Sequence, residues 1–241
     1  MSPEYSQIII EQLKSDAVNK TAGEILELVA QYLENEVVIA TSFGVEDQVI
    51  LDIAARHRIK LQAITLDTGR LFPETYEVWD RTEKQYNLQI KAYYPQSKDL
   101  EELVNNQGIN GFRNGIEQRK ACCSVRKLEP LSRALSNQRA WVCGLRQDQA
   151  ITRANVEPIE WDAQFNLIKV NPLYNWSEED VWRYVKAYDV PYNTLHDQGY
   201  PSIGCAGCTR AITKVQTLRD GRWWWESPES KECGLHNRPR V

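Results

Sequence analysis

The chain has 241 residues, of which 42% are apolar, so it is long enough for one domain with a substantial hydrophobic core. Its 29 lysines and arginines against 33 aspartates and glutamates give a formal net charge of −4, and no overall basic field favours a nucleic acid as ligand. The amino-terminal stretch has no basic segment followed by an apolar run, and no apolar stretch approaches the roughly 20 residues of a membrane-spanning helix. We therefore expect a single domain over residues 1–241, located in the cytoplasm.

Helical and strand patterns alternate along most of the chain. Amphipathic helices are predicted at 21–35, 46–57, 73–87, 97–107, 116–135 and 177–189, and buried strands at 37–42, 61–67, 88–94, 140–145 and 166–173. Ser97 and Ser177 are candidate N-caps. This alternation predicts an α/β fold with a doubly wound, mostly parallel sheet of five strands. The periodicity fades from about residue 190, and residues 205–241 are expected to form a functional tail.

Two loops at predicted strand ends have residues that suit a phosphate. Ligands of doubly wound sheets bind beyond the carboxyl ends of the strands. In the first loop Ser42 offers a hydroxyl, Gly44 permits a tight turn, and the following helix offers free N–H groups. In the second loop, residues 66–74, Arg70 is available for a phosphate. Each loop can also be an ordinary turn, because neither matches the glycine–lysine phosphate loop or the dinucleotide fingerprint.

Four of the six cysteines form two close pairs, Cys122 with Cys123 and Cys205 with Cys208. In a reducing compartment this pattern is more typical of metal binding or catalysis than of disulfides. A tetrahedral zinc needs all four sulfurs on one ion, whereas neighbouring side chains on a helix diverge by roughly 100°. A 4Fe-4S cluster gives each cysteine its own iron, so the pattern favours a cluster over zinc. Thiols without any metal are the third alternative.

Basic residues surround these cysteine pairs in the sequence. They are Arg119, Lys120, Arg126, Lys127 and Arg210. They can neutralise an anionic cluster or hold an anionic substrate, although a basic helix face in solvent is the ordinary alternative. Cys143 lies in a predicted strand and is expected to be a small core residue.

The tail combines arginines, tryptophans and another cysteine. Arg219 and Arg222 are three residues apart, so one turn can aim both at a phosphate. The tryptophans at 223–225 are expected to pack the tail onto the body. Cys233 lies close to basic residues and next to a glycine, where a thiol can become a reactive thiolate, although a lone terminal cysteine is often incidental. His236 can contact a substrate or simply face solvent.

Seven motifs, in order, resemble the sulfonucleotide reductases, the family that acts on adenosine 5′-phosphosulfate (APS) or its 3′-phosphorylated form (PAPS). They are SFGVEDQVILD, LDTGRLFPETY, KACCSVRKLEPL, GLRQDQAITR, GCAGCTRAI, LRDGRWWWE and KECGLH. The last is the most specific, because it carries the nucleophile of the family. Two departures concern local loop geometry: Gly207 stands where relatives often have proline, and residues 215–217 stand where many relatives are more acidic.

The resemblance implies an adenine-nucleotide α-hydrolase-like (PP-loop) fold and reduction of APS to sulfite and AMP through a cysteine S-sulfonate, within sulfate assimilation and cysteine biosynthesis. It implies that a separate thioredoxin or glutaredoxin supplies the electrons. PAPS reduction, or reduction of both nucleotides, is the alternative. A more distant alternative is an ATP pyrophosphatase on the same fold, and a zinc-stabilised nucleic-acid module is a non-enzyme alternative. The sequence is compatible with a homo-oligomer.

The resemblance also assigns roles to individual residues. Cys233 and His236 are the expected catalytic residues. The expected ligands of a 4Fe-4S cluster are Cys122, Cys123, Cys205 and Cys208. The expected contacts with the substrate are Ser42, Phe43, Gly44, Leu71, Lys127, Arg146, Arg219 and Arg222, together with Arg153.

Overall fold

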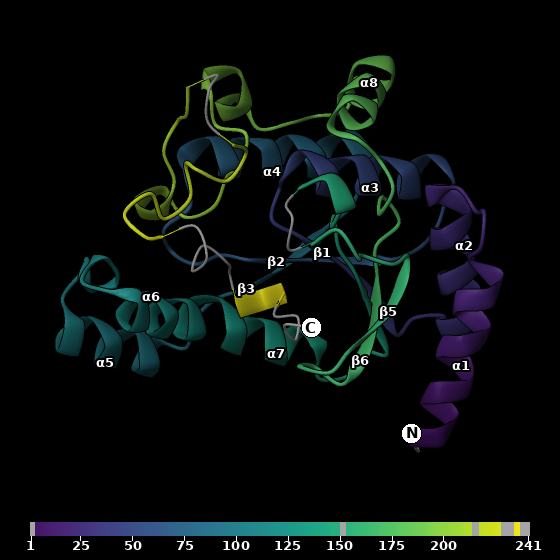
Figure 1. The fold of residues 1–241 in the computed structure, drawn as a ribbon, viewed down its shortest axis with the longest axis horizontal. Coiled ribbons are helices and arrows are strands. Elements are labelled where there is room, and N and C mark those ends of the chain that lie inside the picture. Colours follow the sequence, from purple (N-terminus) through teal and green to yellow (C-terminus); the bar gives the residue numbers. More distant parts are fainter. Residues whose placement is uncertain (1–2, 150–152, 214–216, 228–233, 237–241) are drawn as a thin grey trace. The chain divides into compact units, whose positions relative to one another are not determined.

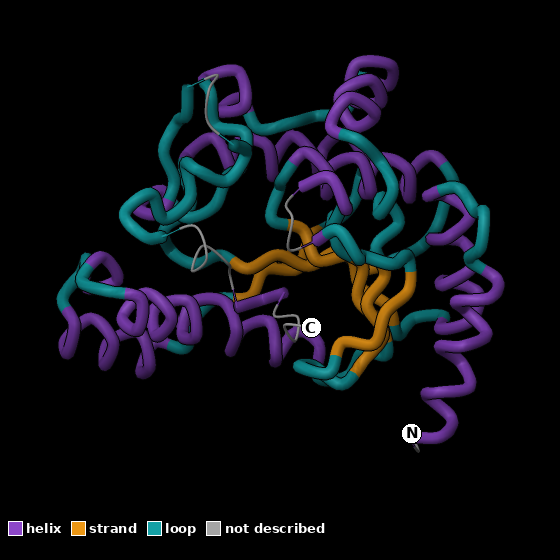
Figure 2. Tube along the Cα trace, in the orientation of Figure 1, coloured by secondary structure: helices purple, strands orange, loops and turns teal. Residues whose placement is uncertain are grey.

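A six-stranded sheet organises the fold in the computed structural model, which describes residues 3–149, 153–213, 217–227 and 234–236. The strands are β1 (Val37–Thr41), β2 (Gln62–Leu66), β3 (Ile90–Tyr93), β4 (Ala140–Val142), β5 (Ile159–Asp162) and β6 (Leu167–Val170). Their order across the sheet is β3-β2-β1-β4-β6-β5, and Figure 2 shows them side by side. β4 pairs in parallel with both β1 and β6, as the predicted mostly parallel sheet requires.

The sixth strand corrects the prediction of five. β5 pairs antiparallel with β6, with Glu160 opposite Lys169, so the two strands form a hairpin at the edge of the sheet. The chain reverses through a short turn in which Asn166 has a left-handed φ of 57°. A four-residue strand that follows a proline shows too little alternation to stand out in the sequence, and pairing with β6 stabilises it.

Within the described ranges, eight α-helices alternate with these strands along the chain (Figure 1). Their bounds are α1 (Pro3–Asp16), α2 (Ala22–Leu33), α3 (Val45–Arg56), α4 (Pro73–Tyr86), α5 (Ser97–Gln107), α6 (Ile116–Cys123), α7 (Glu129–Leu135) and α8 (Glu178–Tyr188). α1 was not predicted. Its Ile8–Ile10 run favours a strand locally, but Ile10 and Leu13 are buried and the helix packs against β5.

Of the two predicted N-caps, one is confirmed and the other is wrong. Ser177 caps α8 as expected: its side chain accepts from the Asp180 backbone, and the Asp180 carboxylate accepts from the Ser177 backbone. Ser97 is not a cap but the first residue of α5, whose N-cap is Gln96 without a side-chain hydrogen bond. The predicted helix over 116–135 is interrupted by a π-helical turn, η2 (Ser124–Leu128), between α6 and α7.

The described chain groups into two compact units. Unit 1 comprises Met1–Ile64, Val78–Lys91 and Leu135–Tyr192, and unit 2 comprises Thr65–Glu77, Ala92–Ala134 and Asn193–Val241. The main hydrophobic core lies in unit 1, where residues from α2, α3 and the central strands are buried together. The single domain expected over residues 1–241 stays a prediction. Among the described helices, none combines the length and the apolar character needed to cross a membrane.

Candidate functional site

The sheet has a topological switch point between β1 and β4. From β1 the chain proceeds outward to β2 and β3, and from β4 it proceeds outward on the other side. The loops after β1 and β4 therefore open at the carboxyl ends of two adjacent parallel strands, where doubly wound sheets bind their ligands. Both loops belong to unit 1.

Asp47 fixes the loop after β1. Its carboxylate accepts hydrogen bonds from the backbone N–H of Ser42 at 2.7 Å and from the Ser42 hydroxyl at 2.9 Å. The left-handed residue of this loop is Phe43, with a φ of 60°, whereas Gly44 is extended with a φ of −64°. The tight turn expected at Gly44 is therefore made one residue earlier. The Phe43 ring is buried and stacks on Trp79, with 5.3 Å between ring centroids, which holds this strained conformation.

Asp47 also gives the loop a pH dependence. Burial raises the pKa of its carboxyl from 3.8 to about 6. Because the folded state then holds the proton more tightly than the unfolded state, this group stabilises the fold fully below pH 3.8, and that stabilisation is lost as the pH rises through about 6. We expect Asp47→Asn to flatten the pH dependence of the free energy of unfolding between these values, measured by urea denaturation. Asp80→Asn, at an exposed position, is the control for the removal of one carboxylate.

Arg146, in the loop after β4, is held by a carboxylate. It is 2% exposed; its Nε and Nη2 donate to Glu46 Oε1 at 3.1 and 2.9 Å, and its Nη1 donates to the Trp176 carbonyl at 3.2 Å. Gln149 Nε2 donates to the same Glu46 oxygen at 2.9 Å, and Gln149 Oε1 accepts from Arg153. Sequence reasoning gave Glu46 and Gln149 no role, although an acidic residue in the first turn of a helix is a visible signal. A phosphate contact by Arg146 or Arg153 stays a prediction.

The loop after β2 is built as a turn. Asp67 Oδ1 accepts from the Gly69 backbone at 2.8 Å and from the Tyr76 hydroxyl at 3.0 Å. Gly69 has a left-handed φ of 68°, a conformation that glycine adopts readily. Leu71, expected near the nucleotide, is half-buried two residues later.

Arg70 is hydrogen-bonded within unit 2 in this structure, and its expected phosphate contact stays a prediction. Its guanidinium donates to the Ile109 carbonyl and to Asn110 Oδ1, and it lies 5.0 Å from the centroid of the Phe112 ring. Its own carbonyl accepts from the Ala206 backbone at 2.8 Å. Arg70 therefore joins its own loop to two other segments of unit 2, to residues 109–112 through its side chain and to Ala206 through its backbone carbonyl.

The two cysteine pairs line one pocket of unit 2. Cys122 and Cys123 end α6, and Cys205 and Cys208 belong to a short turn whose Cys208 N–H donates to the Cys205 carbonyl. The pocket encloses about 330 Å³ with open solvent included. It is lined by Arg70, Phe112, Arg119, Cys122, Cys123, Arg126, Lys127, Cys205, Gly207 and Cys208. The sequence patterns that are 82 residues apart thus meet in space.

Gly207, one of the departures from the family pattern, makes room for an aromatic side chain. A Cβ atom at this position would lie 2.8 Å from Cζ of Phe112. Phe112 is 3% exposed and packs with Cys205, Cys208 and Trp223. Sequence reasoning did not single out Phe112, which belongs to none of the seven motifs.

Cations accompany the buried thiols of this pocket. Burial, and then the neighbouring Cys205, raise the pKa of Cys208 to about 11, whereas Arg222 and Lys127 act in the opposite direction. Arg126 is 5% exposed; its Nη1 donates to the Thr68 carbonyl at 2.5 Å, and its Nε has no hydrogen-bond partner among the described residues. The pocket therefore has positive charge available for an anionic group.

A 4Fe-4S cluster in this pocket stays a prediction. Within the described parts of the chain, no three Cys, His, Asp or Glu side chains converge as one metal ion requires. An iron–sulfur cluster has a separate iron for each thiolate, so four thiols spaced around a pocket can hold it. The buried cations suit the negative charge of such a group.

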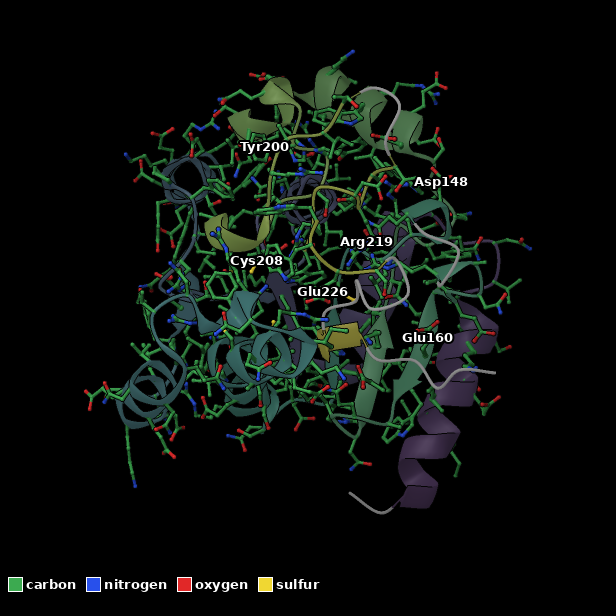
Figure 3. The ribbon with its side chains drawn as sticks, turned by 60° about the vertical axis from the view of Figure 1, so that its left-hand side comes forward. Asp148, Glu160, Tyr200, Cys208, Arg219 and Glu226 are labelled. Atoms are coloured by element: carbon green, nitrogen blue, oxygen red, sulfur yellow. The ribbon has the colours of Figure 1, made fainter. Side chains whose placement is uncertain are left out.

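Arg219 and Arg222 of the tail both lie close to the ring of one tryptophan, Trp223. Trp223 is 1% exposed, and the guanidinium carbons of Arg222 and Arg219 lie 4.7 and 6.0 Å from a ring centroid of that side chain. Arg222 is itself buried, and its Nη1 donates to the Ile203 carbonyl at 3.2 Å. A Cβ atom at Gly204 would lie 2.3 Å from Arg222 Nη2, so this glycine accommodates the guanidinium. Figure 3 labels Arg219 and Cys208 in this unit.

The predicted nucleophile, Cys233, lies outside the described residues. The turn that follows it, η8 (Gly234–His236), lies against η2, the segment that contains Arg126 and Lys127 (Figure 1). The His236 side chain is outside the described part of the structure. The catalytic roles of Cys233 and His236 stay predictions. Cys143 is buried as expected and donates to Asn171 Oδ1 at 3.1 Å.

Known proteins share both the sequence and the fold. The chain is 49% identical over 228 residues to an adenosine 5′-phosphosulfate reductase of Allochromatium vinosum, covering 94% of this chain and 89% of that protein. It is 48% identical to an enzyme of the same name from Rhizobium meliloti, covering 85% and 77%. The crystal structure of phosphoadenylyl-sulfate (PAPS) reductase from Candida auris superposes with a TM-score of 0.71 at 28% identity, covering 88% of this chain and 98% of that one.

More distant structures share the fold alone. The FMN adenylyltransferase of Candida glabrata superposes with a TM-score of 0.55 at 18% identity, covering 97% of this chain and 76% of that one. These likenesses confirm the predicted fold class, an α/β fold with a mostly parallel sheet. The phosphoadenosine phosphosulfate reductase domain matches residues 36–211, which include the loops after β1 and β4 and both cysteine pairs. On this match and on relatives that are nearly half identical, the chain belongs to the APS/PAPS reductase family.

Proposed function

We propose that this protein reduces APS to sulfite and AMP. The observation that carries the proposal is the joining of two cysteine pairs around one pocket, in a chain whose relatives at 48–49% identity are named adenosine 5′-phosphosulfate reductase. A 3′-phosphate would add further negative charge to the nucleotide. PAPS is the second candidate substrate, because the PAPS reductase of Candida auris shares this fold.

We propose that Cys122, Cys123, Cys205 and Cys208 hold a 4Fe-4S cluster. The four thiols line one pocket, and Arg126 and Lys127, which line the same pocket, offset negative charge. When bound, the cluster supplies a compact, fixed charge beside the substrate. Binding as thiolates would overcome the raised pKa of the buried thiols, because a metal ligand must be deprotonated.

In the first chemical step, we propose that the Cys233 thiolate attacks the sulfur of APS. An S–S bond forms, the S–O bond to AMP breaks with its electron pair on the phosphate oxygen, and AMP leaves. Thiolate, sulfate and phosphate are all anionic, so the step needs positive charge. Lys127, Arg219 and Arg222 are the proposed sources, since the last two meet on one tryptophan and Lys127 lines the cysteine pocket. His236 is proposed to assist proton transfer.

In the second step, a dithiol protein of the thioredoxin or glutaredoxin type regenerates the thiol. One of its thiolates attacks the Cys233 sulfur and sulfite departs; its second thiol then resolves the mixed disulfide, so the dithiol supplies two electrons. Thiol exchange of this kind suits a reducing cytoplasm.

The nucleotide is proposed to bind at the switch point of the sheet. The loop there contains Ser42, Phe43 and Gly44. Arg146 lies in the loop after β4, and Arg153 follows that loop. Arg146 is bound to Glu46 in this structure, so a phosphate contact requires it to exchange that partner. Leu71 is proposed to contact the nucleotide as well.

The substrate is tested by sulfite release with thioredoxin and its reductase, on APS and PAPS in parallel. We expect a kcat/KM for APS at least about ten-fold above that for PAPS, a difference of about 1.4 kcal/mol in transition-state stabilisation. Omitting thioredoxin is the control and should stop turnover after one equivalent of AMP. A higher kcat/KM for PAPS would contradict the proposed substrate, and no sulfite from either nucleotide would contradict the reaction.

A further inference from the structure

A buried ion pair joins the tail to the helix that carries the cysteines. Arg119 Nε and Nη2 donate to the two carboxylate oxygens of Glu226 at 2.9 and 2.8 Å. The side chains are 2% and 3% exposed, although the residues are 107 positions apart. A two-bond fork between guanidinium and carboxylate fixes orientation as well as distance.

The pair lies between two functional segments of unit 2. On one side, Arg119 lines the cysteine pocket and interacts with the thiol of Cys123. On the other side, its guanidinium carbon lies 4.7 Å from the ring centroid of Trp223, the side chain that Arg222 also contacts. The Glu226 N–H donates to the Trp223 carbonyl at 2.9 Å, so the carboxylate and the tryptophan belong to one turn.

The conformation of this turn has to be stabilised by residues outside it. Trp223 has a left-handed φ of 41°, which is unfavourable for a bulky residue. Such a conformation persists only where the surroundings impose it. Arg119 contacts both ends of the turn, through the Trp223 ring and through the Glu226 carboxylate.

Arg119 also differs from the other arginines of this region in its partners. The guanidinium groups of Arg70, Arg126 and Arg222 donate to carbonyl, amide or hydroxyl oxygens, which leave their positive charge in place. Glu226 neutralises the charge of Arg119. The pair thus adds little to the field of the pocket, and its contribution is mechanical.

We propose that Glu226 is a positioning residue for the reaction: through Arg119 it fixes the Arg222–Glu226 turn against α6, and so sets the start of the chain that leads to Cys233. This inference rests on the proposed function. Glu226 precedes Cys233 by seven positions. A nucleophile reacts fast only when its chain delivers it in a narrow range of positions, so loosening the start of that chain lowers the rate of the chemical step.

The test is Glu226→Gln, which keeps the shape of the side chain and removes its charge. Three quantities are measured: iron content, hydrogen exchange of the backbone at 217–227, and the single-turnover rate of SO₃ transfer to Cys233 from APS without reductant. We expect iron to be retained, exchange to rise, and transfer to slow by at least about ten-fold, because loss of one partner of a buried ion pair is strongly destabilising locally. Arg119→Gln should match this rate, and the double variant should be no slower than either single variant.

The matched control is Asp162→Asn, which breaks a buried pair of unit 1. Asp162 Oδ2 lies 2.8 Å from Lys169 Nζ, and both side chains are nearly fully buried. This variant should lower the melting temperature without changing exchange at 217–227 or the transfer rate. Unchanged exchange in Glu226→Gln, loss of its iron, or effects of the two single variants that multiply in the double variant would overturn the positioning role. If the wild type forms no adduct, the proposed reaction is wrong, while the exchange measurement still decides whether Glu226 holds the turn.

Discussion

Cys233→Ser is expected to abolish sulfite release while the protein keeps its iron and still binds APS. A serine hydroxyl is a far weaker nucleophile than a thiolate, and it cannot exchange with a dithiol protein. The loss of turnover should be about 10³-fold or more, on the scale seen when an enzyme loses its nucleophile. The measurement is the intact mass after mixing with APS and no reductant. Wild type should gain one SO₃ unit, and the variant should gain none.

Cys143→Ser is the matched control for this experiment. Cys143 is 4% exposed, and burial raises the pKa of its thiol to about 12, so it is neither accessible nor ionised near neutral pH. Serine can still donate to Asn171 Oδ1, as the thiol does. This variant should form the adduct at the rate of the wild type. An adduct that maps to Cys143, or one that persists in Cys233→Ser, would disprove the proposed nucleophile.

Serine at any one of Cys122, Cys123, Cys205 or Cys208 is expected to remove iron and activity together. Changes to residues that merely support a metal ligand lower affinity about 10–100-fold, and loss of a ligand should cost at least as much. The pocket would then hold cations such as Arg126 and Lys127 without the anionic cluster that we propose there. Iron and acid-labile sulfide are measured beside sulfite release. We expect equal amounts of both in the wild type and little of either in the four variants.

Two outcomes would contradict the cluster. Zinc in place of iron in the wild type would favour the single-ion alternative, and full iron in all four variants would place the metal elsewhere. The cluster is proposed to act by its charge and not as an electron carrier. A change of its redox state during turnover, followed by Mössbauer spectroscopy, would contradict that role.

The regular elements of this protein could be predicted because their patterns are local. α8 shows this well: an amphipathic stretch follows Ser177, and the capping box lies within four residues. β5 and α1 escaped prediction because tertiary pairing decides them. β5 is short and forms through its register with β6, and α1 overcomes a β-branched run by packing against β5.

The chemistry-bearing residues of the site were also visible in the sequence, whereas their partners were not. Cysteine pairs identify themselves by spacing, and their meeting in one pocket follows from the fold. The partners of Arg146 and Arg119 are Glu46 and Glu226, which lie about a hundred residues away. The partners of Arg70 were equally hidden, since only the folded structure shows that its guanidinium donates to the Ile109 carbonyl and to Asn110 Oδ1. Backbone conformation is equally hidden: the left-handed position fell on Phe43 and not on the adjacent glycine.

The π-helical turn between α6 and α7 limits how the length of this protein can vary. In η2 the Glu129 N–H bonds to the Ser124 carbonyl, five residues back, so the turn contains one residue more than an α-helical turn. Deleting one residue would let an unbroken α-helix form with regular hydrogen bonds. A π-helical turn takes up its extra residue by widening, so the helix beyond it would keep almost the same direction after this deletion, whereas the residues inside η2 would shift. Insertions and deletions in this stretch are therefore expected to disturb the pocket, because the count of residues in η2 sets the direction in which Arg126 and Lys127 face.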